Sequence, residues 1–328
     1  MKTRLKFIAA SMLALSVATA GGAMADNKTI ATVVKIAGVG WFDRMEKGVD
    51  AFAAANADIN AFQQGPGQAD AAQQAQIIED LIAQNVDAIG VVPLSAETLE
   101  AVLKKARERG IVVVAHEGAT LENIDYDVEA FDNEAYGVHL MDALAERMNG
   151  KGDYATFVGA LTNVTHNIWV DAAVAHQRQK YPEMNWLGEK YVSDEDAQTA
   201  YRKTQEILVT HPSVRGFLGS SSNDVVGIGQ AIDEAGLNDA TEVVGTSIVS
   251  MAGSGLENGS IDMIAAWDPK DAGLAINEIA ARVMRGETIA QGDDLGIPGY
   301  ESVTVDGKVV TGSAWIDMTA DNMGDYDF

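Results

Sequence analysis

The sequence predicts an α/β protein made of two similar halves, each with a mostly parallel sheet covered by helices on both faces. Two observations carry this prediction. Short apolar segments rich in β-branched residues alternate with longer segments of helical period, and the same alternation starts again near the middle of the chain. Parallel strands need crossover connections, which place helices on both faces of a sheet. The 328 residues are enough for two such halves, each with its own core.

The first half contains four predicted strands separated by three helices. Residues 30–36 form a β-branched apolar run, and Phe42, Met45 and Val49 then fall on one helical face. The third helix ends at Gly110 with basic residues in its last turns, where the helix dipole favours them. The expected strands are 30–36, 60–63, 88–92 and 111–115, and the expected helices are 41–56, 70–84 and 98–109.

The second half repeats this order after a polar extended stretch at 125–131 and a helix at 134–148. Helix 269–284 follows the repeat, and residues 300–316 are predicted to form a hairpin around Asp306-Gly307, a dipeptide typical of tight turns. The expected strands of the second half are 154–158, 186–192, 214–218, 243–246 and 261–265, and its expected helices are 167–181, 196–210, 224–235 and 251–256.

The N-terminus has the features of a cleaved export signal. Three basic residues within the first six positions precede an apolar run at 7–20, and an A-x-A cleavage motif ends at Ala25. The apolar run is too short and too rich in alanine to span a bilayer stably, although an uncleaved anchor is the alternative. We therefore expect a signal peptide over residues 1–25 and a mature protein that begins at Asp26 and works outside the cytoplasm.

Composition excludes several classes of function. The formal net charge of −25 repels phosphate backbones and anionic lipid surfaces. We therefore expect the protein to bind neither nucleic acid nor membranes. The chain has no cysteine, which excludes disulfides, thiolate catalysis, iron–sulfur clusters and zinc sites built on cysteine. Stability must therefore come from burial.

No motif for a cofactor, a metal or catalysis is complete. Gly38-x-Gly40 follows the first strand, but Asp43 replaces the third glycine of a dinucleotide fingerprint and would oppose a pyrophosphate. The five histidines form neither H-x-x-x-H nor H-x-H, so zinc has no template. Ser220 begins a run of three serines that lacks the final glycine of a nucleophile elbow. We expect no catalytic residue, no metal and no cofactor.

Ligands of open α/β sheets bind beyond the carboxyl ends of the strands, so the loops there supply the candidate site. If two lobes face each other, these loops meet in one cleft between them. The loops at these positions are 35–41, 93–94, 116–117, 159–169, 220–223, 246–247 and 267–268. The candidate ligand-binding residues are Lys35, Trp41, Phe42, His116, Glu117, Thr165, His166, Asn167, Ser220, Ser222, Asn223, Trp267 and Asp268.

The residue types at these positions suit hydroxyl-rich ligands. Carboxylates such as Glu117 and Asp268 accept strong hydrogen bonds from hydroxyls, although a pair of them also resembles a glycosidase pair. Indole faces pack against the C–H face of a sugar or polyol, and packing in the lobe cores is the alternative role. Ser222 and Asn223 are candidates for ligand contact or for helix capping. We expect the acidic run at 194–196 to be solvated surface.

The chain resembles the type I periplasmic binding proteins of the ribose- and galactose-binding group, which serve ABC importers. The resemblance covers essentially the whole mature chain. Within the group it is most similar to the branch that binds autoinducer-2 and rhamnose. The segments that carry the resemblance are QQAQIIEDLI at 73–82, VDAI at 86–89, Val92-Pro93, Phe131-Asp132-Asn133, Lys35 followed by GVGWF at 38–42, Trp267-Asp268 and DYDF at 325–328.

The resemblance implies two Rossmann-like lobes joined by a three-segment hinge, with crossings near Asn133, Trp267 and 296–300. The first lobe would contain residues 26–133 plus 269–296, and the second 134–268 plus 297–328. It further implies a periplasmic, monomeric, non-enzymatic receptor for a small neutral sugar or polyol, which closes around its ligand and delivers it to the membrane permease of an ABC importer. A chemoreceptor is a further partner that the resemblance allows.

Some positions depart from the autoinducer-2 binders. Lys35 matches the ligand-binding lysine of the branch, and Glu117 replaces an aspartate. Thr165 and His166 stand where those proteins have Asp-Gln, and Ser220 and Ser222 stand where they have Pro and Ala. These changes predict that the pocket recognises a different hydroxyl pattern, because a buried polar group without a partner is costly.

Autoinducer-2 is the alternative ligand. Two other classes of protein are also considered. A glycoside-processing enzyme would turn over sugars, and a sugar-responsive transcription regulator would carry a DNA-binding helix pair and no export signal.

Overall fold

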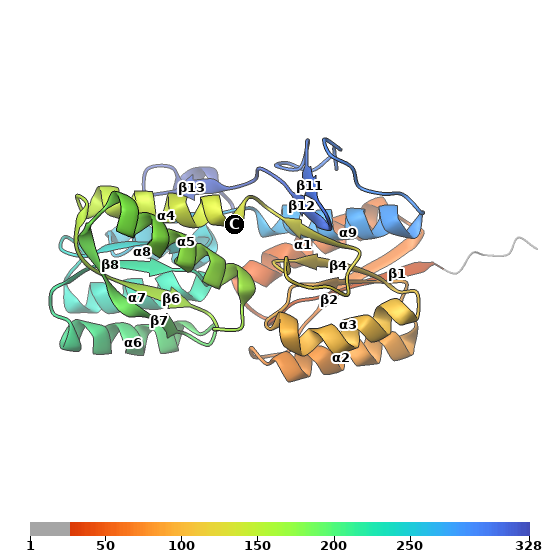
Figure 1. The fold of residues 1–328 in the computed structure, drawn as a ribbon, viewed down its shortest axis with the longest axis horizontal. Helices are drawn as coiled ribbons and strands as arrows, with labels where there is room; N and C mark the ends of the chain where they lie inside the picture. Colours follow the sequence, from red (N-terminus) through yellow and green to blue (C-terminus); the bar gives the residue numbers. More distant parts are fainter. Residues whose placement is uncertain (1–26) are drawn as a thin grey trace, which may run out of the picture.

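The computed structural model describes residues 27–328, so the predicted signal peptide and its cleavage site lie outside the described residues. The described chain forms two lobes, each built on its own sheet (Figure 1). The alternation of strands and helices that the sequence predicts is confirmed in both lobes. No helix in this part of the chain is long and apolar enough to cross a membrane.

Within residues 27–328, the sheet of the first lobe has seven strands in the order β11-β12-β5-β4-β3-β1-β2. All pairs between neighbours are parallel except β11 with β12. Helices α1 and α9 pack together on one face, and α2 and α3 pack together on the other (Figure 1). The elements are β1 (Lys28–Val33), α1 (Gly40–Ala55), β2 (Ile59–Gln64), α2 (Ala71–Gln84), β3 (Ala88–Val91), α3 (Ala96–Glu108), β4 (Val112–His116), β5 (Tyr126–Glu129), α9 (Pro269–Met284), β11 (Thr304–Asp306) and β12 (Val309–Thr311).

The sheet of the second lobe has six described strands in the order β13-β10-β9-β8-β6-β7. Only β13 runs antiparallel to its neighbour. Helices α4 and α5 pack together, and α6 packs against α7. The elements are α4 (Asn133–Arg147), β6 (Lys151–Val158), α5 (Val164–Lys180), β7 (Glu183–Val192), α6 (Ala197–Thr210), β8 (Val214–Gly219), α7 (Ser222–Ala235), β9 (Glu242–Thr246), α8 (Val249–Asn258), β10 (Met263–Ala266), β13 (Ile316–Met318) and the 3₁₀ turn η1 (Met323–Asp325).

Local sequence explains where several helices begin and how closely they pack. Asp70, Ser95 and Asp132 each accept a hydrogen bond from a backbone N–H in the first turn of the helix that follows. At Gly48 a Cβ atom would lie 2.0 Å from the carbonyl oxygen of Lys270, so only glycine allows α1 to approach α9 this closely. This contact fixes α1, whose first turn carries Trp41 and Phe42.

The chain crosses between the lobes three times. The first two crossings lie between β5 and α4 and between β10 and α9. The third was expected at 296–300, but β12 pairs with β5, so the hairpin at 304–311 belongs to the first sheet. The chain therefore crosses between this hairpin and β13, and the expected assignment of residues 304–311 to the second lobe is wrong. The C-terminus lies at the junction of the lobes (Figure 1).

Candidate functional site

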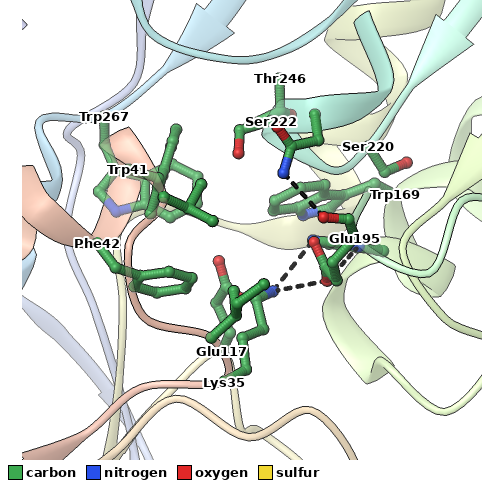
Figure 2. A pocket seen from close by; sticks show the side chains of 14 residues that line it. Lys35, Trp41, Phe42, Glu117, Trp169, Glu195, Ser220, Ser222, Thr246 and Trp267 are labelled. Carbon is green, nitrogen blue, oxygen red and sulfur yellow. Dashed lines mark hydrogen bonds and ion pairs between the residues drawn. The ribbon is translucent and has the colours of Figure 1, made fainter. Parts of the chain in front are cut away.

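One cavity lies between the lobes, where strands of both sheets end. The space between its walls, including its open mouth, is about 350 Å³. Its walls combine charged, hydroxyl and aromatic side chains from both lobes (Figure 2). The lining residues are Lys35, Ile36, Val39, Trp41, Phe42, Glu117, His166, Trp169, Glu195, Ser220, Ser222, Asn223, Thr246 and Trp267.

Lys35 links the two lobes at the centre of this site. Its Nζ atom lies 3.0 Å from Glu117 Oε2 in its own lobe. It also lies 3.4 Å from Glu195 Oε1 and 3.4 Å from His166 Nε2, both of which belong to the second lobe. Figure 2 shows Lys35 between the two glutamates, with dashed lines marking these contacts. The ammonium group therefore holds polar groups of both lobes together.

The electrostatic surroundings determine the charge of each group in this cluster. Burial opposes the charges of Lys35 and Glu117, but their attraction outweighs burial, so the pKa of Lys35 is raised and that of Glu117 is lowered. Burial also opposes the charge of Glu195, but the Lys35 ammonium outweighs it, so the pKa of Glu195 is lowered. Burial and then the Lys35 charge lower the pKa of His166 to about 4. At neutral pH one ammonium therefore faces two carboxylates and a neutral imidazole.

The backbone of both carboxylate residues is in the left-handed region. Glu117 has φ = 60° and Glu195 has φ = 57°, and Asp194 before it also has φ = 57°. This conformation is uncommon for residues other than glycine, asparagine and aspartate, and costs on the order of 1–3 kcal/mol for each residue. Such strain is typical of functional sites, where the surrounding structure holds a side chain in a required direction.

Aromatic rings form the apolar part of the cavity. Trp41, Phe42 and Trp267 gather on one side in Figure 2, and Trp169 lies on the other. The rings of Trp41 and Trp267 meet edge to face with centroids 4.7 Å apart. Trp169 is held in place by its indole N–H, which donates to Asn133 Oδ1 at 2.7 Å at the first crossing. The indoles are thus buried in the lobe junction and also line the cavity.

Three polar atoms of lining residues have no hydrogen-bond partner among residues 27–328. They are the indole nitrogen of Trp267, the hydroxyl oxygen of Ser220 and Oε1 of Glu195. The first is a donor only, the second is a donor and an acceptor, and the third is an acceptor only. Because buried polar groups are usually paired, each of these atoms has the capacity for a further hydrogen bond.

Four of the expected site residues do not line the cavity. Asp268 lies in the second crossing, where its carboxylate accepts from Arg44 Nε at 2.8 Å and from Arg44 Nη2 at 2.6 Å and caps helix α9. Both of its oxygens are therefore already engaged with the protein. His116 is buried beside the ring of Trp267, and its Nδ1 lies 2.6 Å from the carbonyl oxygen of Val128.

Thr165 and Asn167 face other parts of the protein. Thr165 Oγ1 donates to the carbonyl oxygen of Glu117 at 3.1 Å, so it joins the lobes beside the cavity. The side-chain amide of Asn167 donates to Ala160 O and Asn163 O, and its oxygen accepts from Lys190. Helix α5 begins at Val164 rather than at the expected residue 167, which turns these two side chains away.

The most important residue that the sequence analysis missed is Glu195. The run at 194–196 was expected to be solvated, but Glu195 is only 5% exposed and lines the cavity. Its position could have identified it, because Glu195 follows the strand that ends at Val192. The other candidate loops were chosen because they follow the carboxyl ends of strands in the same way. Trp169 of α5 and Thr246 at the end of β9 also line the cavity, and both fall in segments that the rule for strand ends had nominated.

The part of the chain that the structure describes contains no group of three or more His, Asp or Glu side chains arranged to hold a metal ion. The chemistry of the lining residues is that of hydrogen bonding and aromatic packing.

Comparisons with known proteins agree with this architecture. The chain is 27% identical over 278 residues to a xylitol-binding protein of Mycolicibacterium smegmatis, covering 80% of this chain and 74% of that protein. It is 26% identical over 289 residues to the D-allose-binding periplasmic protein of Escherichia coli, covering 83% and 89%.

Two solved structures share the fold. One is an ABC transporter solute-binding protein of Clostridium phytofermentas with bound L-rhamnose, at a TM-score of 0.83 and 22% identity, covering 92% of this chain and 98% of the other. LsrB of Clostridium saccharobutylicum in complex with AI-2 also has a TM-score of 0.83 and 22% identity, covering 92% and 100%. Residues 30–288 match the family described as the periplasmic binding protein domain. With this match and the two-lobed type I fold, the chain belongs to the periplasmic binding protein family.

Proposed function

We propose that this protein is a non-enzymatic periplasmic receptor that binds a small neutral sugar or polyol between its lobes and delivers it to an ABC importer. The observation that carries the proposal is the interlobe cavity, whose walls combine indole rings with a buried donor, a buried acceptor and a hydroxyl that make no hydrogen bond within residues 27–328. Hydroxyl groups can satisfy all three atoms, because each hydroxyl both donates and accepts. The C–H faces of the same ligand would pack against the rings of Trp41 and Trp267.

The contacts between the lobes support closure around the ligand. Thr165 Oγ1 donates to Glu117 O, and Lys35 reaches Glu195 and His166 in the opposite lobe. All of these contacts lie beside the cavity, and separating the lobes would break them. Ligand hydroxyls that contact both lobes would add further bonds to this set and favour the closed form.

A neutral sugar or polyol fits the relatives better than autoinducer-2 does. The relatives matched by sequence are named for xylitol, D-allose, D-ribose and D-xylose. Thr165 replaces an aspartate of the autoinducer-2 binders, which was expected to leave the cavity with one carboxylate fewer. Glu195 supplies a second carboxylate instead, so this replacement does not distinguish a sugar from autoinducer-2. Ser220, which offers a hydroxyl without a partner, remains a feature suited to a further ligand hydroxyl.

Closure can be tested in solution. A thermal-shift screen of pentoses, hexoses, deoxysugars, polyols and autoinducer-2 would identify a ligand, and small-angle scattering would then compare the free and saturated protein. We expect a smaller radius of gyration with ligand and an unchanged circular dichroism spectrum, because the lobes move as units. A free protein that is already open and keeps its radius at saturation would contradict closure. A screen without any stabilising sugar or polyol would contradict the ligand class.

A further inference from the structure

Glu195 is built into the cavity with unusual support from its surroundings. Its Oε2 atom accepts a hydrogen bond from the Ser221 hydroxyl, and its backbone oxygen accepts from Asn223 Nδ2 at 2.8 Å. Its Oε1 atom is 3.4 Å from Lys35 Nζ and has no hydrogen-bond partner among the described residues. The carboxylate is therefore fixed through Oε2, while Oε1 pairs with the Lys35 ammonium and accepts no hydrogen bond from the described residues.

Neighbouring positions are shaped to accommodate this side chain. A Cβ atom at Gly159 would lie 2.3 Å from Glu195 Oε1, so a larger residue there would displace the carboxylate from its present position. Asp194 and Glu195 both adopt φ = 57°, which turns Asp194 to the solvent and Glu195 inward. Left-handed backbone at a glutamate persists only where surrounding contacts stabilise it, which is consistent with a functional position.

The cluster around Glu195 carries an excess of negative charge. Lys35 is its cation, Glu117 is the second carboxylate, and His166 is neutral because burial and Lys35 lower its pKa to about 4. Asp224 lies on α7 beside Ser221, and burial raises its pKa to about 7. It therefore contributes no positive charge that would offset the carboxylates. A ligand with its own negative charge would therefore meet two carboxylates with a single ammonium already shared between them.

We propose that Glu195 is a specificity-determining residue that selects neutral polyhydroxy ligands. Its Oε1 atom, beside Lys35, accepts a hydrogen bond from a ligand hydroxyl, and its charge rejects analogues that carry a carboxylate or a phosphate. This inference rests on the proposed function and adds to it the residue that sets the ligand class. A purely structural role of Glu195 would change affinity for all ligands alike. The proposed role changes the ratio between the affinity for a neutral ligand and the affinity for its acidic analogue.

The test compares matched ligand pairs by calorimetry at pH 7. The pairs are xylitol with xylonate, D-allose with D-allonate and L-rhamnose with L-rhamnonate. Glu195→Gln keeps the size of the side chain and removes its charge. Asp194→Asn is the matched control, because it also removes one negative charge. Asp194 has the same backbone φ as Glu195, but its side chain is exposed. Glu195→Asn is a second variant, since asparagine tolerates the left-handed backbone well.

We expect the wild-type protein to bind the neutral member of a pair at least 100-fold more tightly than the acid. Glu195→Gln or Glu195→Asn should weaken binding of the neutral member at least tenfold and reduce the neutral-to-acid ratio at least tenfold. Asp194→Asn should leave both values within twofold.

Two outcomes overturn the inference while the proposed function stands. One is a wild-type protein that binds an acid as tightly as its neutral partner, which needs no variant to fold. The other is a folded Glu195 variant that keeps the wild-type ratio. A wild-type protein that binds no neutral sugar or polyol contradicts the proposed function itself, and the inference falls with it.

Discussion

The two lobes deliver their charged groups to the cavity in different ways. In the first lobe, Lys35 and Glu117 follow β1 and β4, which are interior strands of the sheet and are mostly buried. In the second lobe, Glu195 follows β7, which is the edge strand of its sheet and is only partly buried. The comparison teaches that a loop after a polar edge strand can supply a central binding group, although its acidic sequence is typical of a solvated surface.

The largest expected effect tests the group that joins the lobes. Lys35→Met removes the ammonium that neutralises Glu117 and Glu195, and breaking a buried ion pair in this way costs about 3–5 kcal/mol of unfolding free energy. Urea denaturation would measure this loss, and calorimetry should show that ligand binding is abolished. Lys47→Met, at an exposed position on helix α1, is the control. A Lys35 variant as stable as this control would contradict the role of Lys35.

The next effect concerns the second lobe and pH. Burial and then Lys35 lower the pKa of His166 to about 4, whereas an unfolded histidine titrates near pH 6.5. As pH falls from 6.5 to 4, the unfolded chain therefore gains a proton that the folded protein does not, and stability falls by about 3 kcal/mol. His166→Gln should remove this part of the pH dependence in urea denaturation at pH 7 and pH 4.5. If His211→Gln, at the end of α6, removes as much of it, the cause lies elsewhere.

A third prediction separates two carboxylates that the sequence placed in one site. Glu117→Gln should weaken ligand binding by about 1.5–3 kcal/mol, because it removes a charged partner at the cavity. Asp268→Asn should change binding by less than about 0.5 kcal/mol, since Asp268 pairs with Arg44 outside the cavity. Calorimetry with the same ligand measures both. Equal losses of binding free energy in the two variants would indicate that Asp268 also contacts the ligand.

The smallest predicted effect concerns closure. Thr165→Val removes one hydrogen bond between the lobes, from Thr165 Oγ1 to Glu117 O, and should weaken ligand binding by about 1 kcal/mol. Thr204→Val removes a comparable buried bond, to Ala200 O, but within helix α6. This control should lose stability and keep its affinity. Similar affinities for the two variants would show that the bond at Thr165 does not contribute to closure.

The sequence predicted the fold well because its signals are local. Buried β-branched runs and helical periodicity locate the strands and helices, and the rule for strand ends brings Lys35, Glu117 and Ser220 to one place. The errors arise where position depends on distant parts of the chain. The pairing of β12 with β5 moved the third crossing, and the partner of Asp268 is Arg44, 224 residues away in sequence. The inward turn of Glu195 depends on φ and on the space at Gly159, which a single sequence does not reveal.

Calorimetry of the wild-type protein tests the central claim most directly. Autoinducer-2 would be titrated beside xylitol, D-allose, D-ribose, D-xylose and L-rhamnose under one set of conditions. We expect at least one neutral sugar or polyol to bind with one-to-one stoichiometry and more tightly than autoinducer-2. Tight binding of autoinducer-2, with no heat from any of the sugars or polyols, would contradict the claim and assign the cavity to that ligand instead.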